Sequence, residues 1–113
     1  MTDVLQVVTT TANHEEAQKI ARTLVEKRLA ACVQVSGPIT STYRWQGSIE
    51  TGQEWRCVAK TRRSHYLVVE QAIRQLNSYE VPEILAVEVK AGNEAYLNWV
   101  ESELADLSGP DFY

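Results

Sequence analysis

The sequence has few cysteines, few histidines and a shortage of positive charge. Its 113 residues include two cysteines, two histidines and 11 Lys or Arg against 15 Asp or Glu, for a net charge of −4 at pH 7. Small secreted scaffolds normally carry several disulfides, so we expect both thiols to be reduced, in a cytoplasmic protein. A chain this acidic has no general attraction to nucleic acid or to an anionic membrane, which excludes both as primary partners.

Long hydrophobic runs are also missing. No apolar stretch approaches the ~18 residues of a membrane-spanning helix, and residues 1–8 lack the basic region and long apolar core of a signal peptide. We therefore expect a soluble protein that is not exported. The length fits one hydrophobic core and excludes a multidomain enzyme, so residues 1–113 are predicted to form a single domain.

Motifs that carry chemistry are scarce. Neither a G-x-G-x-x-G nor a G-x-x-x-x-G-K phosphate loop occurs. Cys32 and Cys57 lie far apart, without the paired spacing of a structural zinc site, and we expect both to be buried. His14 and His65 fall in the predicted first turns of helices, where a solvated side chain is expected. We expect no enzyme, because no positioned nucleophile, base or metal triad is visible.

Hydrophobic periodicity predicts strands that alternate with helices. The expected order is strand 4–10, helix 13–29, strand 31–45 with a bulge at 37–38, strand 49–61 broken near Gly52, helix 64–76, strand 82–90 and helix 93–108, which residues 109–110 stop. This βαββαβ order with an added C-terminal helix is that of the ferredoxin-like α+β sandwich. Two helices would then cover one face of the sheet, and the other face would be left open.

The two middle strands form an unusually long hairpin around a turn at Gln46 and Gly47. Its arms exceed the usual ~5–6 residues of a strand, so their far ends are expected to project and to meet another subunit. Tryptophan supports this interpretation, because Trp45, Trp55 and Trp99 stand against a single Phe and tryptophan is enriched at interfaces.

A set of polar and aromatic side chains lies outside the core pattern. Strand alternation puts Ser41, Tyr43 and Trp45 on one face of the first arm, and Glu54 and Lys60 on one face of the returning arm. Aromatic groups with a few convergent charges are typical of small-ligand clefts and of protein interfaces. Plain structural packing would produce the same pattern.

Two further carboxylates flank the start of the last predicted strand. Glu80 and Glu83 surround a Val-Pro pair, where they could hold a hard cation. Ion pairs with Lys60 or Arg56 are the favoured expectation.

Several separated motifs resemble the CutA divalent-cation tolerance family in their order and spacing. They are residues 26–33 (EKRLAACV), 40–47 (TSTYRWQG), Glu54 with 60–61, 79–84 (YEVPEI) and 96–100 (YLNWV), within a resemblance that runs from Val4 to about Glu103. The resemblance implies a PII-like homotrimer of ferredoxin-like subunits with paired hairpins and strand edges. It implies a role in metal ion homeostasis and the response to metal ions, without catalysis, and a link to copper or another divalent cation.

The resemblance also implies site residues. The cleft between subunits would be lined by Tyr43, Trp45, Glu54, Lys60, Tyr79, Glu83 and Trp99. Cys32 matches the family cysteine and is the candidate metal ligand, whereas Asn77 stands where the family commonly has histidine. An alternative is a PII-like sensor that binds a small anionic metabolite through Lys60. A third hypothesis is a structural trimer whose aromatic residues only pack.

Overall fold

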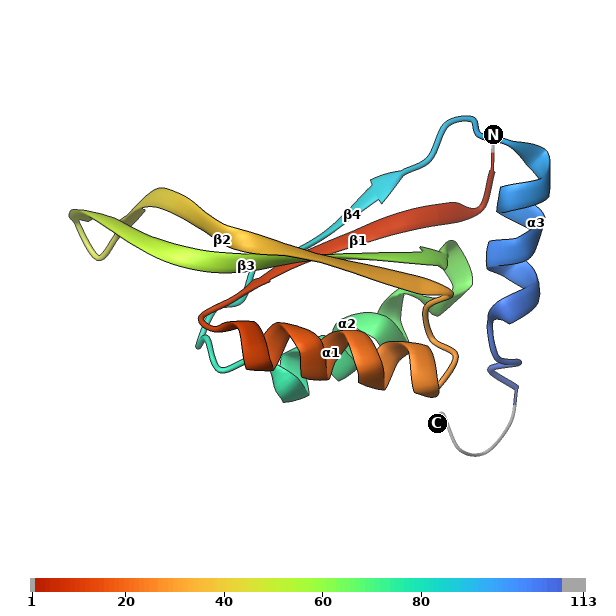
Figure 1. Cartoon of the computed structure of the whole chain (residues 1–113), viewed down its shortest axis with the longest axis horizontal. Coiled ribbons are helices and arrows are strands. Elements are labelled where there is room, and N and C mark those ends of the chain that lie inside the picture. Colours follow the sequence, from red (N-terminus) through yellow and green to blue (C-terminus); the bar gives the residue numbers. More distant parts are fainter. Residues whose placement is uncertain (1, 109–113) are drawn as a thin grey trace.

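The computed structural model describes residues 2–108. Strands and helices alternate as the sequence predicts (Figure 1). The elements are β1 (Val4–Thr11), α1 (His14–Glu26), β2 (Cys32–Trp45), β3 (Ser48–Arg62), a 3₁₀ turn (Arg63–His65), α2 (Tyr66–Leu76), β4 (Ile84–Glu88) and α3 (Glu94–Glu103). The ferredoxin-like α+β prediction is therefore confirmed. No helix within the described residues is long and apolar enough to cross a membrane.

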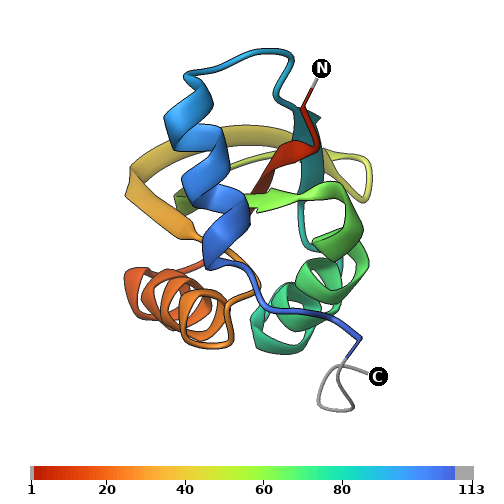
Figure 2. The same cartoon turned by 90° about the vertical axis from the view of Figure 1, so that its right-hand side faces the viewer.

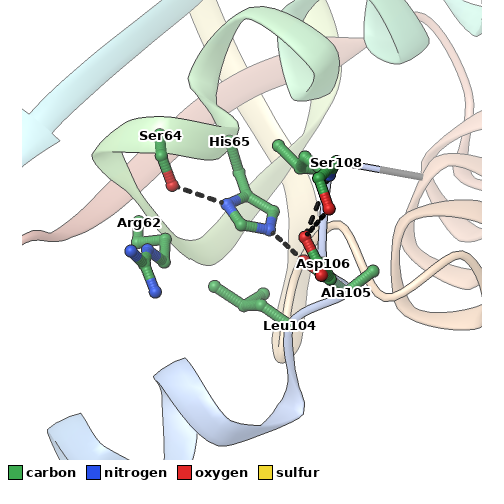
Figure 3. A pocket seen from close by; sticks show the side chains of 8 residues that line it. Arg62, Ser64, His65, Leu104, Ala105, Asp106 and Ser108 are labelled. Atoms are coloured by element: carbon green, nitrogen blue, oxygen red, sulfur yellow. Dashed lines mark hydrogen bonds between the residues drawn. The ribbon is translucent and has the colours of Figure 1, made fainter. Parts of the chain in front are cut away.

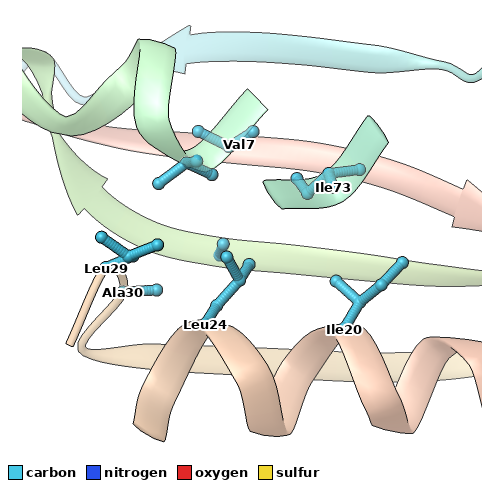
Figure 4. Close-up of a cluster of buried hydrophobic side chains, with 8 residues drawn as sticks. Val7, Ile20, Leu24, Leu29, Ala30 and Ile73 are labelled. Carbon is cyan, nitrogen blue, oxygen red and sulfur yellow. The ribbon is translucent and has the colours of Figure 1, made fainter. Parts of the chain in front are cut away.

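The four strands form one antiparallel sheet in the order β2-β3-β1-β4. Helices α1 and α2 lie side by side against one face of it (Figure 2). Their apolar stripes meet the sheet in a cluster that contains Val7, Ile20, Leu24 and Ile73 (Figure 4). This layer is the hydrophobic core of the chain.

Helix α1 is shorter than its hydrophobic pattern predicts. Asn13 caps its start, because the Asn13 Oδ1 accepts a hydrogen bond from the Glu16 N–H at 2.8 Å. At the other end Arg28 takes a positive φ of 58°, and the N–H groups of Leu29 and Ala30 both bond back to the Leu24 carbonyl. The helix therefore ends at Glu26, and Leu29 enters the core from a turn.

The β2–β3 hairpin is as long as expected. Its strands have 14 and 15 residues, and the predicted bulge is confirmed by a register shift between Ser36 and Ile39. Gly37 in the bulge is required, since a Cβ there would lie 2.6 Å from the Trp55 Cδ1. The predicted break near Gly52 is wrong, because Gly52 pairs with Ser41 in regular register.

The outer part of this hairpin projects beyond the helices (Figure 1). Residues 31–56 include no fully buried residue. A two-stranded ribbon without a third strand or a covering helix is marginally stable in water. The single chain therefore leaves this end of the sheet incomplete.

Helix α3 stands at the end of the sheet away from the hairpin tip (Figures 1 and 2) and contacts the end of the second face there. Arg62 of β3 contacts Glu101 of this helix, with a nitrogen-to-oxygen distance of 3.5 Å. The second face is thus only partly open, and Leu85 and Val87 of β4 remain exposed on it. Helix α3 ends at Glu103, earlier than predicted, and the predicted stop at residues 109–110 lies outside the described residues. Strand β4 is also shorter than predicted.

Candidate functional site

A cleft lies between the outer hairpin and the loop that leads into β4. Its volume of about 630 Å³ falls within the ~300–1,000 Å³ range of small-molecule sites. The lining residues are Thr10, Ser41, Thr42, Tyr43, Trp45, Glu54, Tyr79, Glu80, Val81 and Glu83. Five of the residues predicted for the site are therefore brought together: Tyr43, Trp45, Glu54, Tyr79 and Glu83.

Strand register explains how the hairpin contributes to this cleft. Glu54 pairs with Ile39 across the two arms, so it shares a face with residues 41, 43 and 45 of β2. Tyr43 and Trp45 are 49% and 41% exposed, which leaves their rings accessible from the cleft. The face is the one opposite the helices, since the neighbouring Trp55 points the other way, toward His14 of α1.

The loop on the other side of the cleft is anchored by Asn77. Its Nδ2 donates to the Thr10 carbonyl at 2.9 Å, and its Oδ1 accepts from the Tyr79 N–H at 2.9 Å. The Glu16 carboxylate of α1 adds a bond from the Ser78 N–H at 2.7 Å. Asn77 is buried, and its amide is used to hold Tyr79 in place. The sequence alone marks Asn77 only as a position where the resembled family commonly has histidine.

The charge in the cleft is all of one sign. Glu54, Glu80 and Glu83 take part in none of the ion pairs formed by residues 2–108, and no Lys, Arg or His lines the cleft. The expected ion pairs of Glu80 and Glu83 with Lys60 or Arg56 are therefore wrong. Burial raises the pKa of Tyr79, and its hydrogen bond to Glu54 and the Glu54 charge raise it further. Tyr79 is thus a neutral donor among carboxylates.

Two of the predicted cleft residues lie elsewhere in the single chain. The Lys60 Nζ sits 5.8 Å from the centre of the Tyr96 ring, and this ring is 5.7 Å from that of Trp99. Lys60 of β3 and Trp99 of α3 therefore belong to a cation–π cluster at the contact between these two elements. The chain alone does not bring them to the cleft.

The cysteines differ in environment. Cys57 is buried, its Sγ donates to the Ala17 carbonyl at 3.7 Å, and burial raises its pKa to about 11, so it is a structural thiol. Cys32 is free and only half-buried, so the expectation that it is buried is wrong. Among the described residues no three His, Cys, Asp or Glu side chains gather so that they could hold a metal ion. Cys32 is thus a lone soft donor, and one chain by itself does not fit a closed copper site.

A second cavity, of about 620 Å³, lies beside His65 at the opposite end of the sheet (Figure 3). His65 is 4% exposed, so the prediction of a solvated ring is wrong. Its Nε2 donates to the Ala105 carbonyl at 2.8 Å, and its Nδ1 accepts from the Ser64 hydroxyl at 3.0 Å. Burial lowers the pKa of His65, the Ala105 bond raises it, and the Arg62 charge lowers it. His65 thereby fastens residues 104–108 to the 3₁₀ turn.

Comparison with known proteins gives one consistent family. A family model described as CutA1 divalent ion tolerance protein matches residues 5–103. Protein CutA of Mus musculus is 41% identical over 99 residues, which cover 88% of this chain and 56% of the mouse protein. The divalent-cation tolerance protein CutA of Thermus thermophilus is 40% identical over 94 residues, which cover 83% of this chain and 91% of that relative. The chain therefore spans nearly all of the bacterial relative and about half of the mouse one.

Solved structures of CutA proteins share this fold. CutA from Xylella fastidiosa superposes with a TM-score of 0.89 at 39% identity, over 92% of this chain and all of that chain. A structure titled as the periplasmic divalent cation tolerance protein CutA of Archaeoglobus fulgidus gives a TM-score of 0.85 at 34% identity, over 88% of this chain and 97% of that chain.

Proposed function

The chain belongs to the CutA1 divalent ion tolerance family, and on that premise we propose that it is a divalent-cation tolerance protein that acts in metal ion homeostasis and in the response to metal ions. The observation that carries this proposal is the family match over residues 5–103, which spans both sides of the cleft. We propose that the cleft is the functional surface and that the protein acts by binding, without catalysis.

The functional unit in this proposal is a homotrimer. Strands β2 and β4 are the two edges of the sheet, and β2 presents 14 residues along its edge. Long exposed edges pair with other chains unless they are covered, and the outer hairpin has no core of its own. Exposed Leu85 and Val87 on β4 offer apolar surface to a neighbour. The native mass tests this, since we expect the mass of three chains and a monomer at micromolar concentration would contradict it.

Copper or another divalent cation is the proposed cargo, and Cys32 is the soft donor. Because one chain supplies no three-donor group, binding at Cys32 needs ligands from a second subunit. Calorimetric titration of Cu(I) into the assembled protein should give a stoichiometry that Cys32→Ser lowers. An equal stoichiometry in both proteins would show that Cys32 is not a copper ligand. Cys57→Ser is the matched control.

The alternative function, a sensor of a small anionic metabolite through Lys60, lacks support. Lys60 does not line the cleft, and the three carboxylates there would repel an anion.

Growth under metal stress tests the tolerance function. A host strain that lacks its own relative of this chain, and is sensitive to Cu(II), should regain growth when it expresses the protein. Fractionation of the same cells checks the proposed cytoplasmic location. If the soluble, expressed protein left growth no better than an empty vector across graded Cu(II), Zn(II) and Co(II), the function would be wrong.

A further inference from the structure

We propose that residues 104–108, named the strap, form a pH-sensitive latch that is closed over His65 at neutral pH and opens when His65 gains a proton. The latch is closed by contacts inside one chain, so no other subunit has to complete it. It uses none of the residues that line the hairpin cleft, and it is independent of the proposed metal cargo.

The strap follows α3 and has neither helical nor strand structure. Ala105 ties it down through two hydrogen bonds. The Ala105 carbonyl accepts from the His65 Nε2 at 2.8 Å (Figure 3), and the Ala105 N–H donates to the Arg28 carbonyl at 2.8 Å. Leu107 adds an apolar contact with the core cluster. Of these contacts, the one made by His65 is the one that titrates near neutral pH.

The closed strap selects the neutral form of the His65 ring. Because a carbonyl only accepts, the hydrogen of the neutral ring lies on Nε2, and Nδ1 accepts from the Ser64 hydroxyl at 3.0 Å. A proton on Nδ1 makes the ring a double donor, so that the hydroxyl has to turn and accept. The ring is also buried under the strap, where a charge lacks the water that would stabilise it.

The charges around His65 do not compensate a positive charge on the ring. Arg62 and Asp106 line the same cavity. The Asp106 carboxylate accepts from the N–H of Ser108 at 2.9 Å and from its hydroxyl at 2.7 Å, and Arg62 pairs with Glu101 of α3 at 3.5 Å. The other ion pairs nearby are those of Arg28 with Glu103 and of Arg63 with Glu88. Burial lowers the pKa of His65 most, the Ala105 bond raises it and the Arg62 charge lowers it, with a net shift downward.

Opening of the strap gives the His65 ring access to water. Strap residues form one side of the cavity of about 620 Å³ beside the ring, and once they move away the pKa of His65 returns to its ordinary value near 6.5. Because the pKa is lower in the closed form, protonation favours the open form. Closure is therefore strongest above pH 6.5, and below it the opening constant rises by up to about tenfold per pH unit, as expected for one proton.

Hydrogen exchange of the Ala105 amide, followed by NMR on the full-length assembled protein between pH 7 and pH 5, tests the latch. This N–H is hydrogen-bonded in the closed strap, so its protection factor, the slowing of exchange relative to an unstructured chain at the same pH, reports closure. The Asn77 amide, bonded to the Ile73 carbonyl at 2.9 Å at the end of α2, is the control in the same spectrum. We expect the protection factor of Ala105 to fall about tenfold relative to that of Asn77.

Variants then assign the effect to one histidine. His65→Gln keeps a neutral side chain that can donate to the Ala105 carbonyl and does not titrate, so the ratio of the two protection factors should no longer change with pH. His14→Gln removes the other histidine, which is exposed at the start of α1, and should keep the wild-type fall. If His65→Gln fails to fold, the NMR titration of the His65 ring in the wild-type protein replaces it. We expect a midpoint below pH 6.5 that coincides with the loss of Ala105 protection.

Three outcomes would overturn the latch. They are an equal change of protection at Ala105 and Asn77 in the wild-type protein, a fall at Ala105 that persists in His65→Gln, and a His65 ring that titrates at or above pH 6.5 in the folded protein. Each of these leaves metal tolerance in the growth assay untouched. Failure of growth rescue, in turn, would refute the tolerance function and leave the latch in place.

Discussion

The two ends of the sheet differ in how far the chain satisfies its own polar groups. At the α3 end, Arg28 donates to the Glu103 carbonyl at 2.8 Å and its own carbonyl accepts from the Ala105 N–H at 2.8 Å. His65 fastens the same segment from the other side. At the hairpin end, three carboxylates have no ion pair, two rings are half exposed and residues 31–56 bury nothing completely.

This difference is the reason that the cleft is the proposed binding surface. A network of hydrogen bonds raises the free energy of local unfolding, so the α3 end is expected to belong to the stable part of the fold. Unpaired charge and exposed rings contribute nothing comparable to the stability of a single chain. Natural proteins keep such features where function needs them, and here they coincide with the cleft.

The largest contrast in stability is expected from one substitution made at two places. Ile73→Ala removes a fully buried side chain of the core and should lower the free energy of unfolding by about 2–5 kcal/mol. Ile49→Ala, at the hairpin tip where the side chain is 68% exposed, should change it by less than about 0.5 kcal/mol. Urea unfolding measures both. A similar loss at both positions would place the Ile49 side chain itself within the subunit contacts of the proposed homotrimer.

The network at the α3 end should respond to loss of Arg28. Arg28→Ala removes bonds to the carbonyls of Ser102 and Glu103 and should cost about 1–2 kcal/mol. Arg22→Ala removes an exposed pair with Glu26 four residues away and should cost at most about 0.5 kcal/mol. Equal melting temperatures for the two variants would show that the hydrogen bonds of Arg28 do not stabilise the α3 end of the sheet.

The pH dependence of stability should report on His65. Its pKa in the folded protein lies below the ordinary 6.5, chiefly because of burial, so below about pH 6.5 the unfolded chain binds the proton more readily. The stability from the neutral ring is therefore present above that pH and is lost as the pH falls toward the folded pKa. We expect His65→Gln to flatten the fall of the melting temperature between pH 7 and 5. An unchanged slope would show that the buried ring contributes no such dependence.

The smallest effect on stability is expected in the cleft. Glu54→Gln breaks no ion pair and leaves an amide oxygen that can accept the Tyr79 hydrogen bond, so the free energy of unfolding should change by less than about 0.5 kcal/mol. Chemical denaturation measures this, with Glu83→Gln as its companion. A loss above about 1 kcal/mol would show that the charge of this carboxylate stabilises the fold.

The sequence predicts the strands, the helices and the sheet face of each side chain more securely than the distances between side chains. Alternation correctly grouped Tyr43 with Trp45 on one face of β2, and it gave Lys60 the same face of β3 as Glu54. However, Lys60 lies six residues farther along β3, about 20 Å at ~3.3 Å per residue, and there it meets Tyr96. Alternation along a strand determines the sheet face on which a side chain lies. It does not determine which side chains of other elements that side chain meets.

Long-range packing accounts for the other errors. The burial of His65 depends on residues 104–108 returning to cover it, and no local pattern around His65 encodes that return. Likewise, the end of α1 depends on Leu29 entering the core from a turn at Arg28. The helical periodicity alone continues through this point.

The most direct test of the central claim compares two tryptophans in one spectrum. Trp45 lines the cleft and is 41% exposed. Trp99 lies in the cation–π cluster between α3 and β3 and is 42% exposed. In a ¹⁵N-labelled sample of the full chain, a soluble paramagnetic agent should broaden the Trp45 indole N–H signal less than that of Trp99, because a neighbouring subunit covers the hairpin in the proposed homotrimer. The contradicting result is equal broadening of the two signals, or stronger broadening of the Trp45 signal.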